Sequence, residues 1–203
     1  MLPSLIEMQV SDFPDPVIDA KNVSVTKETA VLAGGCFWCT EGVFVLIEGV
    51  EKVVSGYSGG ERSTANYEAV CTGRTGHAEA IQITFDPSKI SYGQLLKIFF
   101  SVAHDPTQLN RQGHDHGTQY RSAIFYSDPE QKEIAEAYIK QLDDAKVFHS
   151  PIVTKVTPLE AFYPAEEYHQ NYCSRNPNNP YVAGVAEPKA EKTRDYYPEL
   201  LKK

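Results

Sequence analysis

Apolar side chains follow two different spacings along the chain, and the spacing changes from one segment to the next. Short apolar or alternating runs, the pattern of strands, occupy residues 30–33, 53–57, 78–85, 120–126 and 152–157. Apolar positions three and four residues apart, the pattern of helices, occupy residues 41–50, 91–102, about 129–144 and 160–172. The sequence therefore predicts strands and helices that interleave along the chain.

The order of these elements predicts an α+β fold. We expect a single domain in which helices flank a mixed β-sheet, as a two-layer α/β sandwich, because hairpin-like steps interrupt the alternation of strand and helix. No glycine-rich motif of the Rossmann or P-loop type follows a predicted strand. Residues 1–28 are expected to form an N-terminal arm on the surface, 29–182 the catalytic domain and 183–203 an extended C-terminal tail.

Composition is that of an ordinary soluble protein with the length, 203 residues, of one domain. The formal net charge of −8 argues against nucleic acid and anionic membranes as partners, because both attract basic surfaces. No apolar run approaches the roughly 18–20 residues of a membrane span, and the N-terminus lacks the pattern of a signal peptide. We expect a soluble, cytoplasmic monomer.

Four cysteines, at positions 36, 39, 71 and 173, bring thiol chemistry into the picture. Without a secretory signal, reactive or simply buried thiols are expected rather than structural disulfides. Cys36 follows Gly34 and Gly35, between a predicted strand and a predicted helix. A helix N-terminus lowers the pKa of a thiol, which gives Cys36 a route to activation. An inert cysteine at the end of a strand is the alternative, and position alone favours it.

Three further features point to a site around this cysteine. Phe37 and Trp38, the only tryptophan, follow it directly and can enclose a small apolar group. Glu79, at the start of an alternating run, can donate a proton if burial keeps it neutral. Tyr67 and Tyr120 can hydrogen-bond an oxygen on which charge develops. The two aromatic residues could instead pack in the core, the acid could be exposed, and the two tyrosines could be unrelated. Each feature alone is therefore weak evidence for a site.

Several motifs occur in one order along the chain. They are Gly-Cys-Phe-Trp at 35–38, Val-Ser-Gly-Tyr-Ser-Gly-Gly at 54–60, the run at 66–79 ending in Gly-His-Ala-Glu, Phe-Asp-Pro at 85–87, the loop at 104–113, Asp-His-Gly-Thr-Gln-Tyr-Arg-Ser at 115–122 and Ala-Glu-Glu-Tyr-His-Gln at 165–170. Over about residues 30–180 the chain closely resembles the A-type peptide methionine sulfoxide reductases. The Gly-Cys-Phe-Trp tetrapeptide alone is moderately specific, but the whole ordered set is very specific.

The resemblance implies a reaction at Cys36. Cys36 would be the nucleophile, Glu79 the acid that protonates the sulfoxide oxygen, and Tyr67 and Tyr120 its hydrogen-bond donors. Attack on the sulfoxide sulfur would release methionine and leave Cys36 as a sulfenic acid. A second cysteine would then form a disulfide, which a dithiol reduces by exchange. The resemblance suggests thioredoxin as that partner.

The resemblance also implies a pocket and a substrate. Phe37 and Trp38 would hold the methyl group, while Asp115 and His116 would shape the pocket. The family reduces the S epimer of methionine sulfoxide, free or in proteins, and needs no metal and no bound cofactor. Its fold is α+β, in agreement with the pattern of strands and helices.

The sequence departs from many relatives at the resolving cysteine. Their cysteine follows an Asn-Pro-Asn-x-Pro-Tyr run, but here the run at 176–181 is followed by Val182. Cys173 can replace it if the tail is mobile, and we favour it. Cys39 is the rival through its C-x-x-C spacing from Cys36, although two cysteines on one helical turn can be poorly oriented. An external thiol could also act directly, and Cys71 is interpreted as buried structure.

Two other functions fit parts of the sequence. A general thiol–disulfide oxidoreductase could use Cys36 and Cys39, but that motif expects a thioredoxin-like βαβ context that is not present. A zinc module could use these cysteines with His104, His114 or His116, but such sites usually have two close ligand pairs. We therefore expect no metal.

Overall fold

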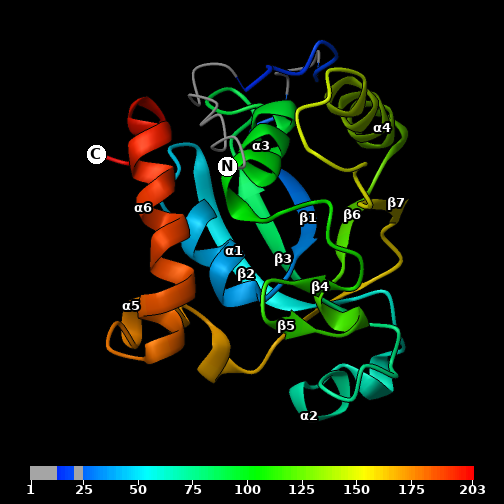
Figure 1. The fold of residues 1–203 in the computed structure, drawn as a ribbon, viewed down its shortest axis with the longest axis vertical. Helices are drawn as coiled ribbons and strands as arrows, with labels where there is room; N and C mark the ends of the chain where they lie inside the picture. Colours follow the sequence, from blue (N-terminus) through cyan, green and yellow to red (C-terminus); the bar gives the residue numbers. More distant parts are fainter. Residues whose placement is uncertain (1–12, 21–24) are drawn as a thin grey trace, which may run out of the picture.

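A single β-sheet runs through the centre of the computed structural model, which describes residues 13–20 and 25–203 (Figure 1). The sheet has six strands in the order β7-β6-β1-β3-β2-β8, and it is mixed because β6 and β7 are parallel while the other neighbours are antiparallel. The strands are β1 (Glu28–Gly34), β2 (Val50–Ser58), β3 (Ala78–Phe85), β6 (Ser122–Tyr126), β7 (Lys155–Pro158) and β8 (Phe162–Pro164). A small separate hairpin joins β4 (Arg111–Gln112) to β5 (Asp115–His116).

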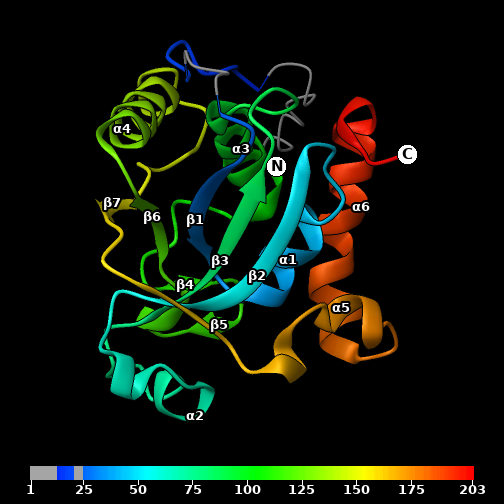
Figure 2. The same ribbon diagram turned by 180° about the vertical axis from the view of Figure 1, so that it is seen from behind.

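Helices cover one face of this sheet. Figures 1 and 2 show α1, α3 and α6 on the same side of the sheet, with α4 beside the edge formed by β6 and β7. The longer helices are α1 (Phe37–Phe44), α3 (Tyr92–Ile98), α4 (Pro129–Asp144) and α6 (Glu187–Tyr196), and the short ones are α2 (Tyr67–Val70) and α5 (Tyr172–Arg175). The predicted α+β class with flanking helices is confirmed.

The strand β1 is buried on both faces, which explains its uninterrupted apolar sequence. Leu32 points into the main core beneath the helices. Val31 and Ala33 belong to a smaller cluster on the opposite face, where Leu159 and Phe162 pack against them. The helical layer thus covers one face, and the segment around β7 and β8 covers part of the other.

Local signals set the starts of two helices as the sequence predicts. Ser91 accepts the backbone N–H of Gln94 and the Gln94 side chain accepts the Ser91 N–H, which forms a capping box for α3. Asp128 caps α4, with Pro129 in its first turn. The predicted helix at 160–172 is wrong, because β8 and a 3-10 turn at Glu167–His169 occupy it. Pro164 lies on an edge strand, where its missing N–H is tolerated.

The C-terminal segment is helical, so the prediction of an extended tail at 183–203 is wrong. A π-helical turn at Val182–Ala186 leads into α6, and a 3-10 turn at Pro198–Leu200 follows it. The buried residues of this segment recur at helical spacing, as Ala186, Ala190, Thr193 and Tyr197. This stripe of mostly small residues lies against α1 and the π-helical turn at Phe99–Ala103 that follows α3.

The described part of the N-terminal arm lies across α3 and α4. Phe13 packs edge-on against Phe148, with ring centroids 6.2 Å apart. Asp15 forms an ion pair with Lys97 of 2.7 Å, and Asp19 accepts the backbone N–H of Gly93 at 2.8 Å. Residues 1–12 and 21–24 of the predicted arm lie outside the described residues. Within the described part of the chain no helix is long and apolar enough to cross a membrane.

The packing of the C-terminal segment predicts a clear difference between two neighbouring tyrosines. Tyr197 is 4 % exposed and its hydroxyl is 2.7 Å from that of Ser101, whereas Tyr196 is 36 % exposed. Tyr197→Ala should lower the free energy of unfolding by about 3–4 kcal/mol, and the control Tyr196→Ala should change it by less than about 0.5 kcal/mol. Urea denaturation measures both, and equal effects would contradict the packing of this segment.

Candidate active site

Cys36 lies at the junction of β1 and α1, as the sequence predicts. It is the N-cap of α1, with φ −58° and ψ 126°, and it is 8 % exposed. Gly35 forms the turn with φ +88°, and a Cβ on it would lie 2.6 Å from the Gln112 side chain. Glycine is therefore required here by both conformation and space.

Cys36 and Cys39 form a buried pair in the first turn of α1, and each thiol shifts the pKa of the other. Burial raises the pKa of the Cys36 thiol well above its ordinary value, and Cys39 and the nearby Glu79 act in the same direction. Cys36 lowers the pKa of Cys39 to about 7 against the effect of burial, with help from Lys189. The expected fall in the pKa is thus found on Cys39 and not on Cys36.

The N-cap geometry explains how two cysteines of one turn meet. Cys36 has non-helical dihedral angles, so its side chain does not follow the helical spiral. Its carbonyl accepts the backbone N–H of Cys39 at 3.1 Å, which closes the first turn. The two sulfur atoms can therefore approach each other although both residues belong to the start of α1.

Glu79 lies beside this pair as a buried acid. It comes from β3, is 2 % exposed, and its Oε2 accepts the backbone N–H of Phe37 at 3.0 Å. Burial raises the pKa of its carboxyl to about 8; the Phe37 bond opposes this, while Asp115 and Cys39 add to it. At neutral pH this side chain therefore holds a proton that it can donate.

Tyr67 and Tyr120 reach the same region from two different elements. Tyr67 is the first residue of α2, and Tyr120 ends a 3-10 turn at Thr118–Tyr120. Burial raises the pKa of both hydroxyls, and Glu79 and Cys36 contribute to both shifts. Both tyrosines are therefore neutral donors in electrostatic contact with the acid and the thiol.

Aromatic rings enclose the start of α1. Phe37 is buried, and its ring centroid lies 6.5 Å from that of Trp38. Tyr172 stacks on Trp38 with a centroid distance of 3.7 Å and an interplanar angle of 5°. Tyr181 meets Trp38 edge-on at 6.0 Å. The two residues that the sequence assigns to a methyl pocket thus belong to a larger aromatic cluster.

The β4–β5 hairpin brings one of its two predicted residues to the cysteines. Asp115 accepts the Tyr181 hydroxyl at 2.5 Å, and that same hydroxyl lies 3.7 Å from the Cys39 sulfur. His116 is exposed on the hairpin, where it lies opposite Arg111 in the register of the two strands. The site therefore contains Asp115, while His116 lies at its margin.

The remaining cysteines occupy different surroundings. Cys173 lies in α5 beside α1, where its thiol donates to the Trp38 carbonyl at 3.3 Å. Burial raises the pKa of this thiol to about 12. Cys71 is exposed after α2, so its interpretation as buried structure is wrong. All four thiols are free in this structure.

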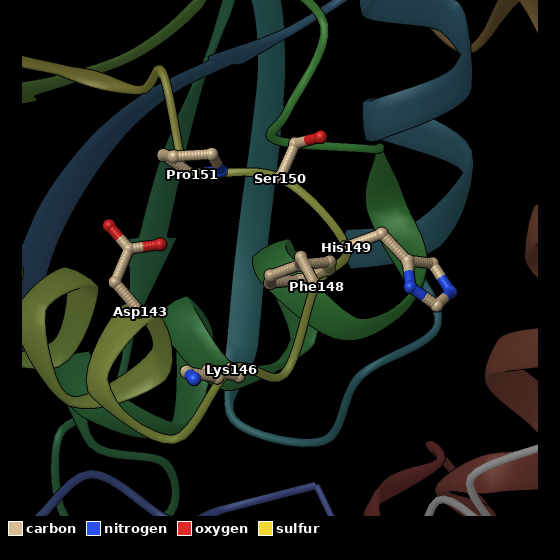
Figure 3. Close-up of a pocket in the computed structure, with 6 residues that line it drawn as sticks. All are labelled: Asp143, Lys146, Phe148, His149, Ser150 and Pro151. Atoms are coloured by element: carbon tan, nitrogen blue, oxygen red, sulfur yellow. The ribbon is translucent and has the colours of Figure 1, made fainter.

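A cavity of about 360 Å³ opens beside the two cysteines, between the β4–β5 hairpin and the C-terminal segment. Its lining includes Cys36, Cys39, Asp115, Tyr181 and Lys189. Another cavity, of about 400 Å³, lies at the end of α4 and is lined by Asp143, Lys146, Phe148, His149, Ser150 and Pro151 (Figure 3). It shares no lining residue with the cysteine site.

Sequence reasoning missed several residues of this site. Tyr181 is the last residue of the run at 176–181, from which only the missing cysteine was inferred. His169 lies in the motif at 165–170, but the sequence assigns it no role. Tyr172 and Lys189 carry no local signal, because only tertiary packing brings them to α1. Among the described residues, no group of three or more His, Cys, Asp or Glu side chains could hold a metal ion, as a zinc module would require.

Comparison with known proteins shows the family to which the chain belongs. The family model of peptide methionine sulfoxide reductase matches residues 28–200. Peptide methionine sulfoxide reductase MsrA 2 of Synechocystis is 55 % identical over 93 % of this chain and 90 % of its own length. MsrA 2 of Mesorhizobium japonicum is 56 % identical over 85 % of this chain and 89 % of its own.

Solved structures show the same fold. Methionine sulfoxide reductase A of Corynebacterium diphtheriae is 35 % identical, with a TM-score of 0.66 over 82 % of this chain and 84 % of its own. Reduced Mxr1 of Saccharomyces cerevisiae is 33 % identical, with a TM-score of 0.68 over 82 % and 94 % of the two chains.

A buried thiol pair beside a carboxyl group with a raised pKa supplies the groups that a thiol-dependent oxidoreductase needs. The chain belongs to the peptide methionine sulfoxide reductase family, and its activity is that of the A type. The same comparisons disfavour a general thiol–disulfide oxidoreductase.

Proposed function

We propose that Cys36 attacks the sulfur of a methionine sulfoxide while Glu79 protonates the departing oxygen. The oxygen moves from substrate to enzyme, so that the products are methionine and a Cys36 sulfenic acid. Proton donation is needed because an unprotonated oxide is a poor leaving group. Tyr67 and Tyr120 hydrogen-bond the oxygen as charge develops on it.

The hydrogen bond between Phe37 N and Glu79 Oε2 is the observation that carries this proposal. It holds the carboxyl group against the backbone of the residue that follows the nucleophile. Burial keeps that carboxyl group protonated. An ionised carboxylate beside a thiol would raise the pKa of the thiol and oppose formation of the thiolate, whereas a neutral carboxyl group does not. Glu79 can therefore serve a thiolate nucleophile and still supply a proton.

The substrate is proposed to be the S epimer of methionine sulfoxide, free or in proteins. Phe37 and Trp38 would enclose its methyl group, and Asp115 would contact the part nearest the β4–β5 hairpin. His116 would shape the pocket from its margin. The half-buried Trp38 supports access by a side chain that projects from an oxidised protein.

The sulfenic acid is proposed to be resolved within the chain. The sequence favours Cys173 for this step, whereas the structure favours Cys39, which is buried with Cys36 in the same first turn of α1. Cys173 would first have to leave its bond to the Trp38 carbonyl. We therefore propose Cys39 for the first disulfide and keep Cys173 as the alternative.

Regeneration is proposed to use an external dithiol of the thioredoxin type, which reduces the disulfide by exchange. No metal or bound cofactor enters this scheme. We propose a monomer in the cytoplasm, the compartment that maintains such reductants.

Single-turnover chemistry tests the proposed function. Reduced protein mixed with racemic methionine sulfoxide, without reductant, should release methionine from the S epimer only. Cys36→Ser should release none, while the control Cys71→Ser, which removes an exposed thiol, should match the wild type. Chiral chromatography of the remaining sulfoxide gives the readout, and methionine release by Cys36→Ser would refute the assignment of the nucleophile.

Two variants distinguish the resolving cysteines. In Cys39→Ser we expect a Cys36 sulfenic acid that dimedone traps, whereas Cys173→Ser should still form a Cys36–Cys39 disulfide. Mass spectrometry after one turnover measures both species. A Cys36–Cys173 disulfide that forms equally fast in Cys39→Ser would instead establish Cys173 as the resolving residue.

A further inference from the structure

Two titratable side chains beside the site have no part in the proposed reaction. Glu166 and His169 belong to the segment between β8 and α5, more than 120 positions along the chain from Cys36. His169 is 1 % exposed. A buried histidine next to a reactive thiol pair calls for a physical explanation.

His169 lies in the middle of the aromatic cluster. Its ring centroid is 5.0 Å from that of Phe37, 5.7 Å from Trp38, 4.6 Å from Tyr67 and 4.1 Å from Tyr168. It therefore contacts both predicted methyl-pocket residues and one of the two tyrosines. Packing of this kind alone could be supplied by a phenylalanine.

A hydrogen bond distinguishes the histidine from a phenylalanine. Trp38 Nε1 donates to His169 Nδ1 at 3.2 Å. Because an indole N–H can only donate, Nδ1 must be unprotonated, and the neutral ring then carries its proton on Nε2. Burial lowers the pKa of His169, which keeps the ring neutral and able to accept.

Glu166 faces the other side of the histidine ring. Its Oε2 is 3.8 Å from His169 Nε2, too far for a hydrogen bond but close enough for electrostatic attraction. Glu166 is itself held by Tyr57, whose hydroxyl donates to Oε2 at 2.8 Å, and by Tyr67, whose backbone N–H donates to Oε1 at 2.8 Å. A fixed negative charge here favours the proton on Nε2 and leaves Nδ1 free to accept.

We propose that His169 is a positioning residue that fixes the indole of Trp38 in its own plane and so sets the size of the methyl pocket. Glu166 holds His169 in the accepting tautomer. That Phe37 and Trp38 hold the methyl group rests on the proposed function. The hydrogen bond between Trp38 and His169 does not depend on it.

Two contacts are needed to hold the indole because they restrict different motions. Stacking on Tyr172 fixes the plane of the ring, since the centroids are 3.7 Å apart and the planes differ by 5°. Stacked rings can still slide and rotate within that plane at little cost. The bond to His169 is directional, so it removes this remaining freedom.

The single tryptophan makes the hydrogen bond directly observable, because the chain gives one indole N–H signal in a ¹H–¹⁵N spectrum. His169→Phe keeps the ring but removes the acceptor, so the signal should move upfield and exchange faster with water. His169→Asn places an amide oxygen near the position of Nδ1 and should largely restore both properties. An indole signal and exchange rate unchanged in folded His169→Phe would overturn the proposal.

Kinetics test what the hydrogen bond does for the substrate. His169→Phe should raise KM for methionine S-sulfoxide by about tenfold, the size of one hydrogen bond, with a smaller effect on kcat. The preference for methionine sulfoxide over ethionine sulfoxide should also fall by about tenfold, because a loosened wall admits one more methylene. Rescue by His169→Asn is expected in both measurements.

A double-mutant cycle separates positioning from general destabilisation. In a Trp38→Phe background no indole remains to be held, so His169→Phe should have little further effect on KM. An undiminished effect in that background would assign His169 a merely structural role and contradict the proposal. If the wild type reduces no sulfoxide, the proposed function fails while the indole measurement still decides the hydrogen bond.

Neighbouring carboxylates provide the matched control for Glu166. Glu166→Gln should broaden or shift the indole signal, because the charge that favours the accepting tautomer is lost. Glu167→Gln removes a charge from the adjacent exposed residue and should leave the signal unchanged. Identical spectra for these two variants would refute the part assigned to Glu166.

Discussion

The hydrogen bond from the Phe37 backbone to the Glu79 carboxyl group joins the start of α1 to β3, and the rest of the site depends on it. It uses one of the N–H groups that every helix leaves unpaired in its first turn. Glu79 is also buried, and this burial outweighs the opposing effect of the bond and raises the pKa of its carboxyl to about 8. The bond thus places the acid beside the thiol, and the burial of the side chain, not the bond, keeps the acid protonated.

Charge links the acid to the thiol pair. A negative charge on Cys39 raises the pKa of Glu79, so the reduced pair and the protonated acid favour each other. Lys189, from the C-terminal helix, stabilises the charge on Cys39. Oxidation of the pair to a disulfide removes that charge, and the acid then loses one cause of its raised pKa. The site is therefore best prepared to donate a proton when its thiols are reduced.

Local patterns in the sequence predict the sheet and the position of the nucleophile. The apolar run before Gly34 and Gly35 places Cys36 at a helix start, and Glu79 shares the alternating face of Ile81 and Ile83 in β3. These features depend on neighbours in sequence. The family motifs add the pocket residues, but the spacing alone could not separate a buried Glu79 from an exposed one.

The helical tail and the aromatic contacts around Trp38 could not be predicted, and both failures have a common physical origin in the C-terminal part of the chain. The stripe that buries α6 consists mainly of Ala186, Ala190 and Thr193, whose small side chains give a weak apolar signal among many charges. Tyr172 and Tyr181 meet Trp38 only through tertiary packing. No local pattern encodes such contacts, so neither the aromatic cluster nor the helical tail could be predicted from spacing.

The pH dependence of the first turnover tests the central claim most directly, namely that Glu79 supplies the proton. Rapid-quench measurement of methionine release without reductant should give a rate that rises near pH 7, as the thiol pair ionises, and falls above about pH 8, as Glu79 loses its proton. Glu79→Gln should be slower by about 10²–10⁴-fold and should lose the fall at high pH. A Glu79→Gln enzyme as fast as the wild type, with the same fall above pH 8, would contradict the account.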